Sequence, residues 1–159
     1  MIDLPYSDKW KEDYYRALED EKKRVENYLN NKQKISQEDK LEITPKRLEL
    51  IFKLYKEKDI ELNQALEDIL YLWRQIKSYE LAFERKNFIK IIFTEDAIDN
   101  ILEVAVKKDW GIFTYCEKIM SKLEYSLNYL KEAHGKEVVY INSLAFKDPE
   151  KFIKEYLLI

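Results

Sequence analysis

The sequence predicts a mainly α-helical protein that carries a small two-stranded β-ribbon. The chain of 159 residues contains only two glycines and three prolines, whereas sheet-rich folds need many such residues for their tight turns. Apolar residues recur at helical spacing along most of the chain, and only two short runs are rich in β-branched and aromatic residues. Because 46% of the residues are apolar, a chain of this length can bury a core.

Residues 1–60 are predicted to form a helical extension, for which the sequence suggests no role. Ser7 is a favourable N-cap residue for a helix that reaches about Asn30, and the polar stretch Asn30–Asp39 is interpreted as a linker. Thr44 and Pro45 are predicted to open a second helix, with threonine as the cap and proline at the first helical position, where its missing N–H costs nothing.

Residues 61–159 are predicted to form a second domain that holds both strands. A long helix with an apolar stripe from Leu62 to Phe83 comes first, and Asp59 is its predicted cap. The later elements are predicted in this order: a strand at Phe88–Phe93, a helix capped by Thr94, a break at Asp109–Gly111, a helix from Ile112 to His134 closed by Gly135, a strand at Val138–Ile141, and a last helix opened by Asp148–Pro149.

Charge and cysteine content narrow the classes of partner and compartment. The 28 basic and 31 acidic side chains give a net charge of −3, so the chain as a whole does not attract a phosphate backbone. The single cysteine, Cys116, excludes an internal disulfide and fits a reducing compartment. No apolar run reaches the length of a membrane span, and the N-terminus lacks a basic region followed by an apolar block. The sequence therefore predicts a cytoplasmic protein without a membrane partner.

Four blocks between residues 76 and 141 resemble the small C-terminal lid domain of Clp-type AAA+ unfoldases. Ile76–Glu84 is similar to the family's helix with a K-x-Y-x-x-x-F pattern, and Ile91–Ile98 is similar to its F-T-x-x-A-L junction between a strand and a helix. Lys107–Gly111 resembles the basic residue and glycine that open the sensor-2 helix, and Val138–Ile141 matches the closing strand. The resemblance implies a lid that packs against an ATPase domain and transmits its nucleotide state.

The chain departs from the family at the position that would contact nucleotide. The resemblance implies an alanine and then the sensor-2 arginine after Gly111, but Ile112 and Phe113 occupy these positions. A phenylalanine cannot supply the charge-assisted contact that an arginine makes with a phosphate. The sequence also contains no G-x-x-x-x-G-K-[ST] motif. We therefore expect no enzymatic activity and no cofactor for the chain alone, with ATP and Mg²⁺ bound only if it is joined to an AAA+ large domain.

The chain offers few residues for chemistry of its own. His134 is the only histidine and has no evident partner for base catalysis, so a role at the end of its helix is favoured. Cys116 is interpreted as a small buried apolar residue rather than a reactive thiol. No metal site is predicted, since zinc usually needs four Cys or His ligands. The acidic run Glu19–Glu21 continues into basic residues, which is typical of a solvated helix face.

Three hypotheses follow from these observations. The first is the AAA+ lid-like domain, with Gly111, Ile112 and Phe113 at the nucleotide side and Trp110, Tyr115, Lys107 and Lys108 as interaction residues. The second is a stand-alone helical adaptor, antitoxin-like or viral protein, that binds a protein partner through its aromatic residues. The third is a weak nucleic-acid-binding protein that uses the basic positions and aromatics of residues 46–58, and it ranks below a protein partner because acidic residues interrupt that segment.

Overall fold

The computed structural model describes residues 7–35 and 41–157. In these residues the protein is mainly helical with a small two-stranded parallel sheet, which confirms the predicted fold class. The chain divides into two compact units, Met1–Leu66 and Glu67–Ile159, which we call unit one and unit two. The division lies inside helix α3 (Leu62–Asn87), a few residues beyond the boundary suggested by the sequence.

Unit one contains two complete helices, α1 (Ser7–Ile35) and α2 (Pro45–Glu57). Helix α1 is longer than predicted, because the first part of the expected linker is helical through Ile35, while residues 36–39 of that linker lie outside the described residues. The lysines and glutamine of this stretch favour helix, so polarity alone was a poor sign of a loop. Among its described side chains, α1 buries only Val25 and Leu29.

The start of α2 matches the prediction. The Thr44 hydroxyl accepts a hydrogen bond from the Arg47 N–H at 3.2 Å, and Pro45 occupies the first helical position. Arg47 is 1% exposed and donates from Nη1 to the carbonyl oxygen of Glu42 at 2.8 Å, so its side chain is buried.

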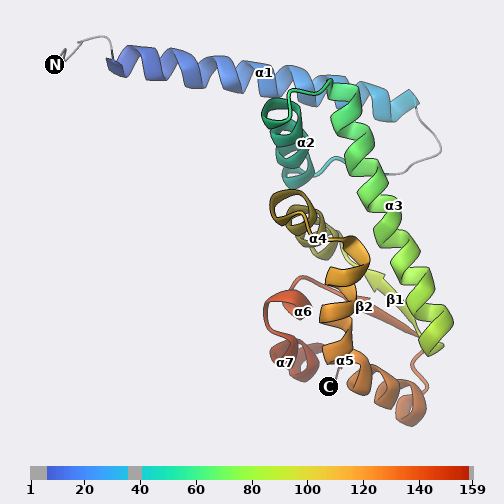
Figure 1. The fold of residues 1–159 in the computed structure, drawn as a ribbon. Helices are drawn as coiled ribbons and strands as arrows, with labels where there is room; N and C mark the ends of the chain where they lie inside the picture. Colours follow the sequence, from blue (N-terminus) through green and yellow to red (C-terminus); the bar gives the residue numbers. More distant parts are fainter. Residues whose placement is uncertain (1–6, 36–40, 158–159) are drawn as a thin grey trace. The chain divides into compact units, whose positions relative to one another are not determined.

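Unit two is built around a pair of parallel strands, β1 (Lys90–Phe93) and β2 (Val138–Ile141), which lie side by side in Figure 1. Parallel strands need a long crossover connection, which α4 (Glu95–Lys108) and α5 (Ile112–His134) supply. Short elements follow β2: α6 (Leu144–Lys147), α7 (Pro149–Phe152) and the π-helical turn η1 (Ile153–Leu157).

The core of unit two is formed by one face of each long element. Ile91 and Phe93 of β1 and Val139 and Ile141 of β2 alternate with more exposed residues and are buried. Fully or nearly fully buried helical side chains meet them, among them Ile76, Ile98, Ile101, Leu102, Ile112, Met120, Leu123, Leu127 and Phe152. The alternation of the strands and the helical spacing of the apolar residues therefore meet in one core.

Two local predictions are corrected, and two further observations were not anticipated from the sequence. The first strand begins at Lys90 rather than Phe88, because α3 continues to Asn87 and Phe88 takes the left-handed conformation (φ 57°) that commonly ends a helix. Asp59 also has a positive φ of 49° and lies before the start of α3, so it does not cap that helix. Tyr14 and Tyr28 of α1 are exposed, although their spacing is helical. The short α6 was not anticipated.

Candidate functional site

The turn that opens α5 brings several predicted site residues together. Asp109 ends α4 in the left-handed conformation (φ 53°), which aspartate tolerates better than most residues. Gly111 is the N-cap residue of α5 with φ −65° and ψ 140°, and its carbonyl oxygen accepts the N–H of Tyr115 at 3.0 Å. The predicted break at Asp109–Gly111 is thus confirmed, and it leaves Trp110 between the two helices.

Trp110 is 41% exposed and has two neighbours that contact its ring. Its ring makes an edge-to-face contact with Tyr115 at a centroid distance of 5.8 Å, and the Lys118 ammonium lies 4.9 Å from the centroid of a Trp110 ring. Tyr115 stacks in turn on Phe146 of α6 at 5.7 Å, and burial raises the pKa of its hydroxyl. Trp110 is therefore a partly exposed ring that Tyr115 and Lys118 orient, and partly exposed aromatic rings are typical interface anchors.

The two residues that replace the alanine and arginine of the resemblance lie in different environments. Ile112 is 2% exposed and belongs to the core, whereas Phe113 is 47% exposed. The Phe113 ring makes an edge-to-face contact with Tyr79 of α3 at 5.5 Å. This part of α5 therefore presents an aromatic ring to solvent, and it offers no cation at the position of the expected arginine.

Ring contacts connect Trp110 and Phe113 through the interior of unit two. Successive centroids are 5.5 to 6.2 Å apart in this series, which we call the aromatic chain: Trp110, Tyr115, Phe146, Phe93, Tyr79 and Phe113. Its members come from α3, β1, α5, α6 and the turn before α5. Such contacts favour defined ring orientations. The aromatic chain therefore joins these elements into one body, with an exposed ring at each end.

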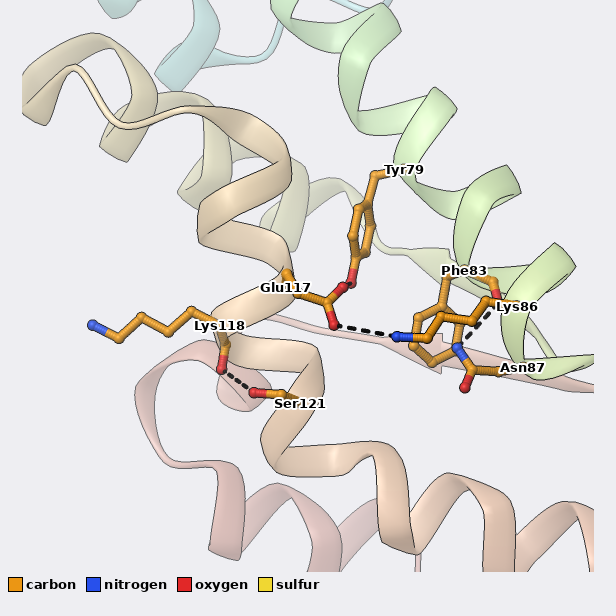
Figure 2. A network of polar contacts seen from close by, with 7 residues as sticks. All are labelled: Tyr79, Phe83, Lys86, Asn87, Glu117, Lys118 and Ser121. Atoms are coloured by element: carbon orange, nitrogen blue, oxygen red, sulfur yellow. Dashed lines mark hydrogen bonds and ion pairs between the residues drawn. The ribbon is translucent and has the colours of Figure 1, made fainter.

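A polar network reinforces the contact between α3 and α5, as Figure 2 shows. The Tyr79 hydroxyl donates a hydrogen bond to Glu117 Oε2 at 2.9 Å, and Lys86 Nζ lies 4.0 Å from Glu117 Oε1. Burial and the bond to Glu117 raise the pKa of Tyr79, which keeps the hydroxyl protonated as the donor. The network fixes the Tyr79 ring against which Phe113 packs.

The remaining predicted interaction residues, Lys107 and Lys108, lie at the end of α4. Lys107 forms an ion pair with Glu103 one turn earlier, with 3.5 Å between Nζ and Oε2, and Lys108 is exposed. Neither belongs to the aromatic chain. The structure therefore places Trp110 and Tyr115 in direct ring contact and links Phe113 to them through Tyr79, Phe93 and Phe146. The two lysines form a basic end of the preceding helix.

Cys116 and His134 differ in their access to solvent. Cys116 is fully buried, as predicted, and burial together with the Glu80 and Glu117 carboxylates raises the pKa of its thiol to about 12. A protonated, buried thiol is a poor nucleophile. His134 is exposed at the end of α5 with its ring 5.7 Å from that of Tyr129, and Gly135 closes the helix with φ 64°, as predicted.

Glu80 is a structural residue that the sequence did not single out. It is 9% exposed, its Oε2 accepts the N–H of Phe93 at 2.7 Å, and its Oε1 lies 3.2 Å from Lys77 Nζ. The available signal was a carboxylate directly beside the apolar stripe at Tyr79. No sequence pattern indicated that its partner is the backbone of a strand 13 residues further along the chain.

Comparisons with known proteins identify no relative of this chain. No protein-family model, no curated protein and no solved structure matches this chain. Within residues 7–35 and 41–157, the His, Cys, Asp and Glu side chains form no group of three or more that could hold a metal ion. In the same residues, no helix combines the length and apolar character needed to cross a membrane.

Proposed function

We propose that this chain is a non-catalytic helical domain that acts by packing against a protein partner, in the manner of the C-terminal lid of a Clp-type AAA+ ATPase in the cytoplasm. Each of the four resembling blocks has the secondary structure that the resemblance calls for: the first lies in α3, the second joins β1 to α4, the third opens α5, and the fourth contains β2. This agreement supports the proposal because four short patterns chosen by chance would not all fall on the right kind of element.

The feature that carries the proposal is the aromatic chain with its two exposed ends. Trp110 directly precedes the N-cap residue of α5 and Phe113 lies in its first turn, and the rings between them connect α3, β1 and α6. A domain that transmits a partner's nucleotide state must move as one body and must offer anchors to that partner. Without an arginine at Phe113, coupling to nucleotide would depend on packing of these rings rather than on a phosphate contact.

The first experiment asks whether an ATPase module accompanies this chain. The native transcript is sequenced upstream and downstream for a P-loop and an acidic Walker B strand, and the encoded module is co-expressed with the chain. The proposal predicts that ATP hydrolysis by the assembly responds to the chain, whereas the chain alone turns over no nucleotide above a denatured control. The absence of any such module from the transcript and from the neighbouring genes would contradict the AAA+ hypothesis.

The second experiment tests the two anchors in that assembly. Replacing Trp110 and Phe113 with alanine is expected to weaken the effect of the chain on ATP hydrolysis at least about tenfold, since buried aromatic anchors commonly contribute 2 kcal/mol or more each. Tyr125 serves as the matched control because it is 84% exposed on the same helix and lies outside the aromatic chain. An equal loss from Tyr125→Ala would assign the effect to general damage to α5.

A stand-alone adaptor is the second candidate, and the exposure of α1 favours it. Tyr14 and Tyr15 are 52% and 63% exposed, their rings are in edge-to-face contact at 5.8 Å, and the described side chains from Lys11 to Ala17 are all exposed. An adaptor would use this helix to bind a partner. If no ATPase module is found, pull-down by the wild type but not by a Tyr14→Ser, Tyr15→Ser double variant would support the adaptor.

The basic segment of α2 gives less support to nucleic-acid binding. Lys53 lies 2.6 Å from Glu57, and Lys56 lies 2.6 Å from Glu21, with distances measured between Nζ and a carboxylate oxygen. Lys46 lies 3.7 Å from Glu49. Because Arg47 is buried as well, most cations of this segment already have carboxylate partners or are buried. Absence of salt-dependent binding to single-stranded and duplex DNA would exclude this candidate.

A further inference from the structure

Within residues 7–35 and 41–157, the outer backbone edge of strand β2 pairs with no other strand. Its only partner strand in the described residues is β1, and the Lys90 and Thr94 N–H groups donate to the carbonyl oxygens of Glu137 and Ile141, both at 2.9 Å. In a parallel ladder, alternate residues face the partner strand. Residues 137, 139 and 141 therefore face β1, and Val138 and Tyr140 direct both their N–H and C=O groups away from it.

The two outer edges of the sheet have different neighbours. On β1, the outward N–H of Phe93 is satisfied by the buried carboxylate of Glu80 at 2.7 Å. The outward edge of β2 borders a cleft of about 610 Å³ instead. Val139 belongs to the buried face of the strand, and Val138 and Tyr140 belong to the exposed face, yet all three line this cleft. Because residues from both faces of β2 line the cleft, we infer that the cleft runs along the outer edge of this strand.

The other walls of the cleft are aromatic, aliphatic and basic. Tyr129, Leu130 and His134 of α5 contribute on one side and Tyr156 and Leu157 of η1 also line it, together with Lys136. The tyrosines are between 48% and 64% exposed where they line the cleft. Among the described residues that line it, the ionisable groups besides the tyrosines are His134 and Lys136, and none of these residues is a carboxylate. Lys136 forms no ion pair with any other described residue.

We propose that the edge of β2 binds an extended, acidic segment of a partner protein as a third strand. Two outward N–H groups and two outward C=O groups at strand spacing match a peptide backbone, which supplies both donors and acceptors. A phosphate chain supplies acceptors only and would leave the two carbonyl groups unpaired. The tyrosine rings cover alternate side chains of the added strand, and Lys136 selects carboxylates. The edge of β2 does not include Trp110 or Phe113, and the proposal does not depend on the AAA+ hypothesis.

Selection from a displayed library of random eight-residue peptides on the full chain tests the proposal. We expect enrichment of peptides that combine Asp or Glu with β-branched residues. When an enriched peptide is titrated into ¹⁵N-labelled protein, the shifted amides should lie in residues 136–141 and 156–157, and the Val138 and Tyr140 amides should exchange with solvent more slowly. Enrichment without acidic residues, no enrichment, or shifts confined to other residues would refute the proposal.

Two charge reversals of the same kind separate recognition from a general charge effect. Lys136→Glu is expected to weaken binding of the enriched peptide roughly tenfold, as a lost or reversed charge contact at an interface does. Lys122→Glu is the matched control, because Lys122 is exposed on α5 and does not line the cleft. Equal weakening by both variants would contradict the assigned role of Lys136. Circular dichroism confirms that each variant is folded.

Two further outcomes would assign the edge to a different occupant. Single-stranded DNA that competes with the peptide at Lys136 would indicate a nucleic-acid site and overturn the proposal. Peptide binding that appears only after removal of residues 158–159 would mean that the chain's own end fills the edge, which also overturns it. Tyr140→Pro removes an outward N–H that β1 does not use, so it should abolish peptide binding while the fold is retained.

Discussion

Removal of the Glu80 carboxylate should destabilise unit two through a single backbone group. Glu80 accepts the Phe93 N–H at 2.7 Å, and with 9% exposure it leaves little room for water to replace it. A hydrogen bond to a charged group contributes about 1.5–3 kcal/mol, and an unsatisfied buried N–H costs about 1–3 kcal/mol. The ion pair with the 37% exposed Lys77 adds at most about 1 kcal/mol. We therefore expect Glu80→Ala to cost about 2–3 kcal/mol.

Two matched variants identify the hydrogen bond as the cause. Glu80→Gln keeps an acceptor oxygen and loses only the charge, so it should cost about 1 kcal/mol, since neutral hydrogen bonds contribute about that amount. Glu132→Ala removes an exposed carboxylate from α5 and should change stability by less than about 0.5 kcal/mol. The order of stability should be wild type and Glu132→Ala, then Glu80→Gln, then Glu80→Ala.

Denaturation and hydrogen exchange measure the effect at two levels. Urea unfolding followed by circular dichroism gives the change in the free energy of unfolding. Exchange of the Phe93 amide, measured by nuclear magnetic resonance, should accelerate in Glu80→Ala more than exchange of other amides in unit two. If Glu80→Ala unfolds within about 0.5 kcal/mol of the wild type and Phe93 exchange is unchanged, the carboxylate does not support the strand edge and the reasoning is wrong.

Three further predictions concern other single residues. Phe88 has φ 57°, and the Lys131 ammonium lies 4.9 Å from its ring centroid, so Phe88→Gly and Phe88→Ala both lose that contact. Only glycine relieves the left-handed strain, so Phe88→Gly should be about 0.5–1 kcal/mol more stable than Phe88→Ala in urea unfolding, and equal stability would contradict this. Burial raises the pKa of Asp96, but hydrogen bonds from Thr94 and Ser143 outweigh it and hold the pKa at about 2, so stability present above pH 4 should be lost as the pH falls toward 2. After allowance for solvent screening the loss is about 1 kcal/mol, and Asp96→Asn should remove it; identical acid unfolding curves would exclude this role. The buried Cys116 thiol should react with a disulfide reagent at least about a hundredfold more slowly in the native protein than in urea, and equal rates would refute its burial.

Local chemistry made the helix ends and the strands predictable. Thr44 and Pro45 open α2, Asp148 accepts the Lys151 N–H at 3.1 Å at the start of α7, and Gly135 closes α5. These signals work because a cap depends on residues within one turn of the helix end. The hydrophobic strand Val138–Ile141 was also predicted with its observed bounds.

Some local sequence patterns were misleading because an adjacent helix extended through the segment. Phe88 has the composition of a strand residue, but α3 continues to Asn87 and requires a left-handed residue after it. The polar stretch at the end of α1 consists of residues that suit an exposed helix, and its polarity was mistaken for a linker.

The sequence by itself determined the mainly helical class, the position of both strands, the break before Gly111 and the burial of Cys116, since each follows from composition or from contacts within a few residues. Only the tertiary structure decided that the strands pair in parallel and that the rings from Trp110 to Phe113 form one series. It also decided that Glu80 accepts an outward N–H of β1, while the outer edge of β2 borders a cleft. These features depend on contacts between residues far apart in the chain, and local sequence patterns do not indicate which distant residues come into contact.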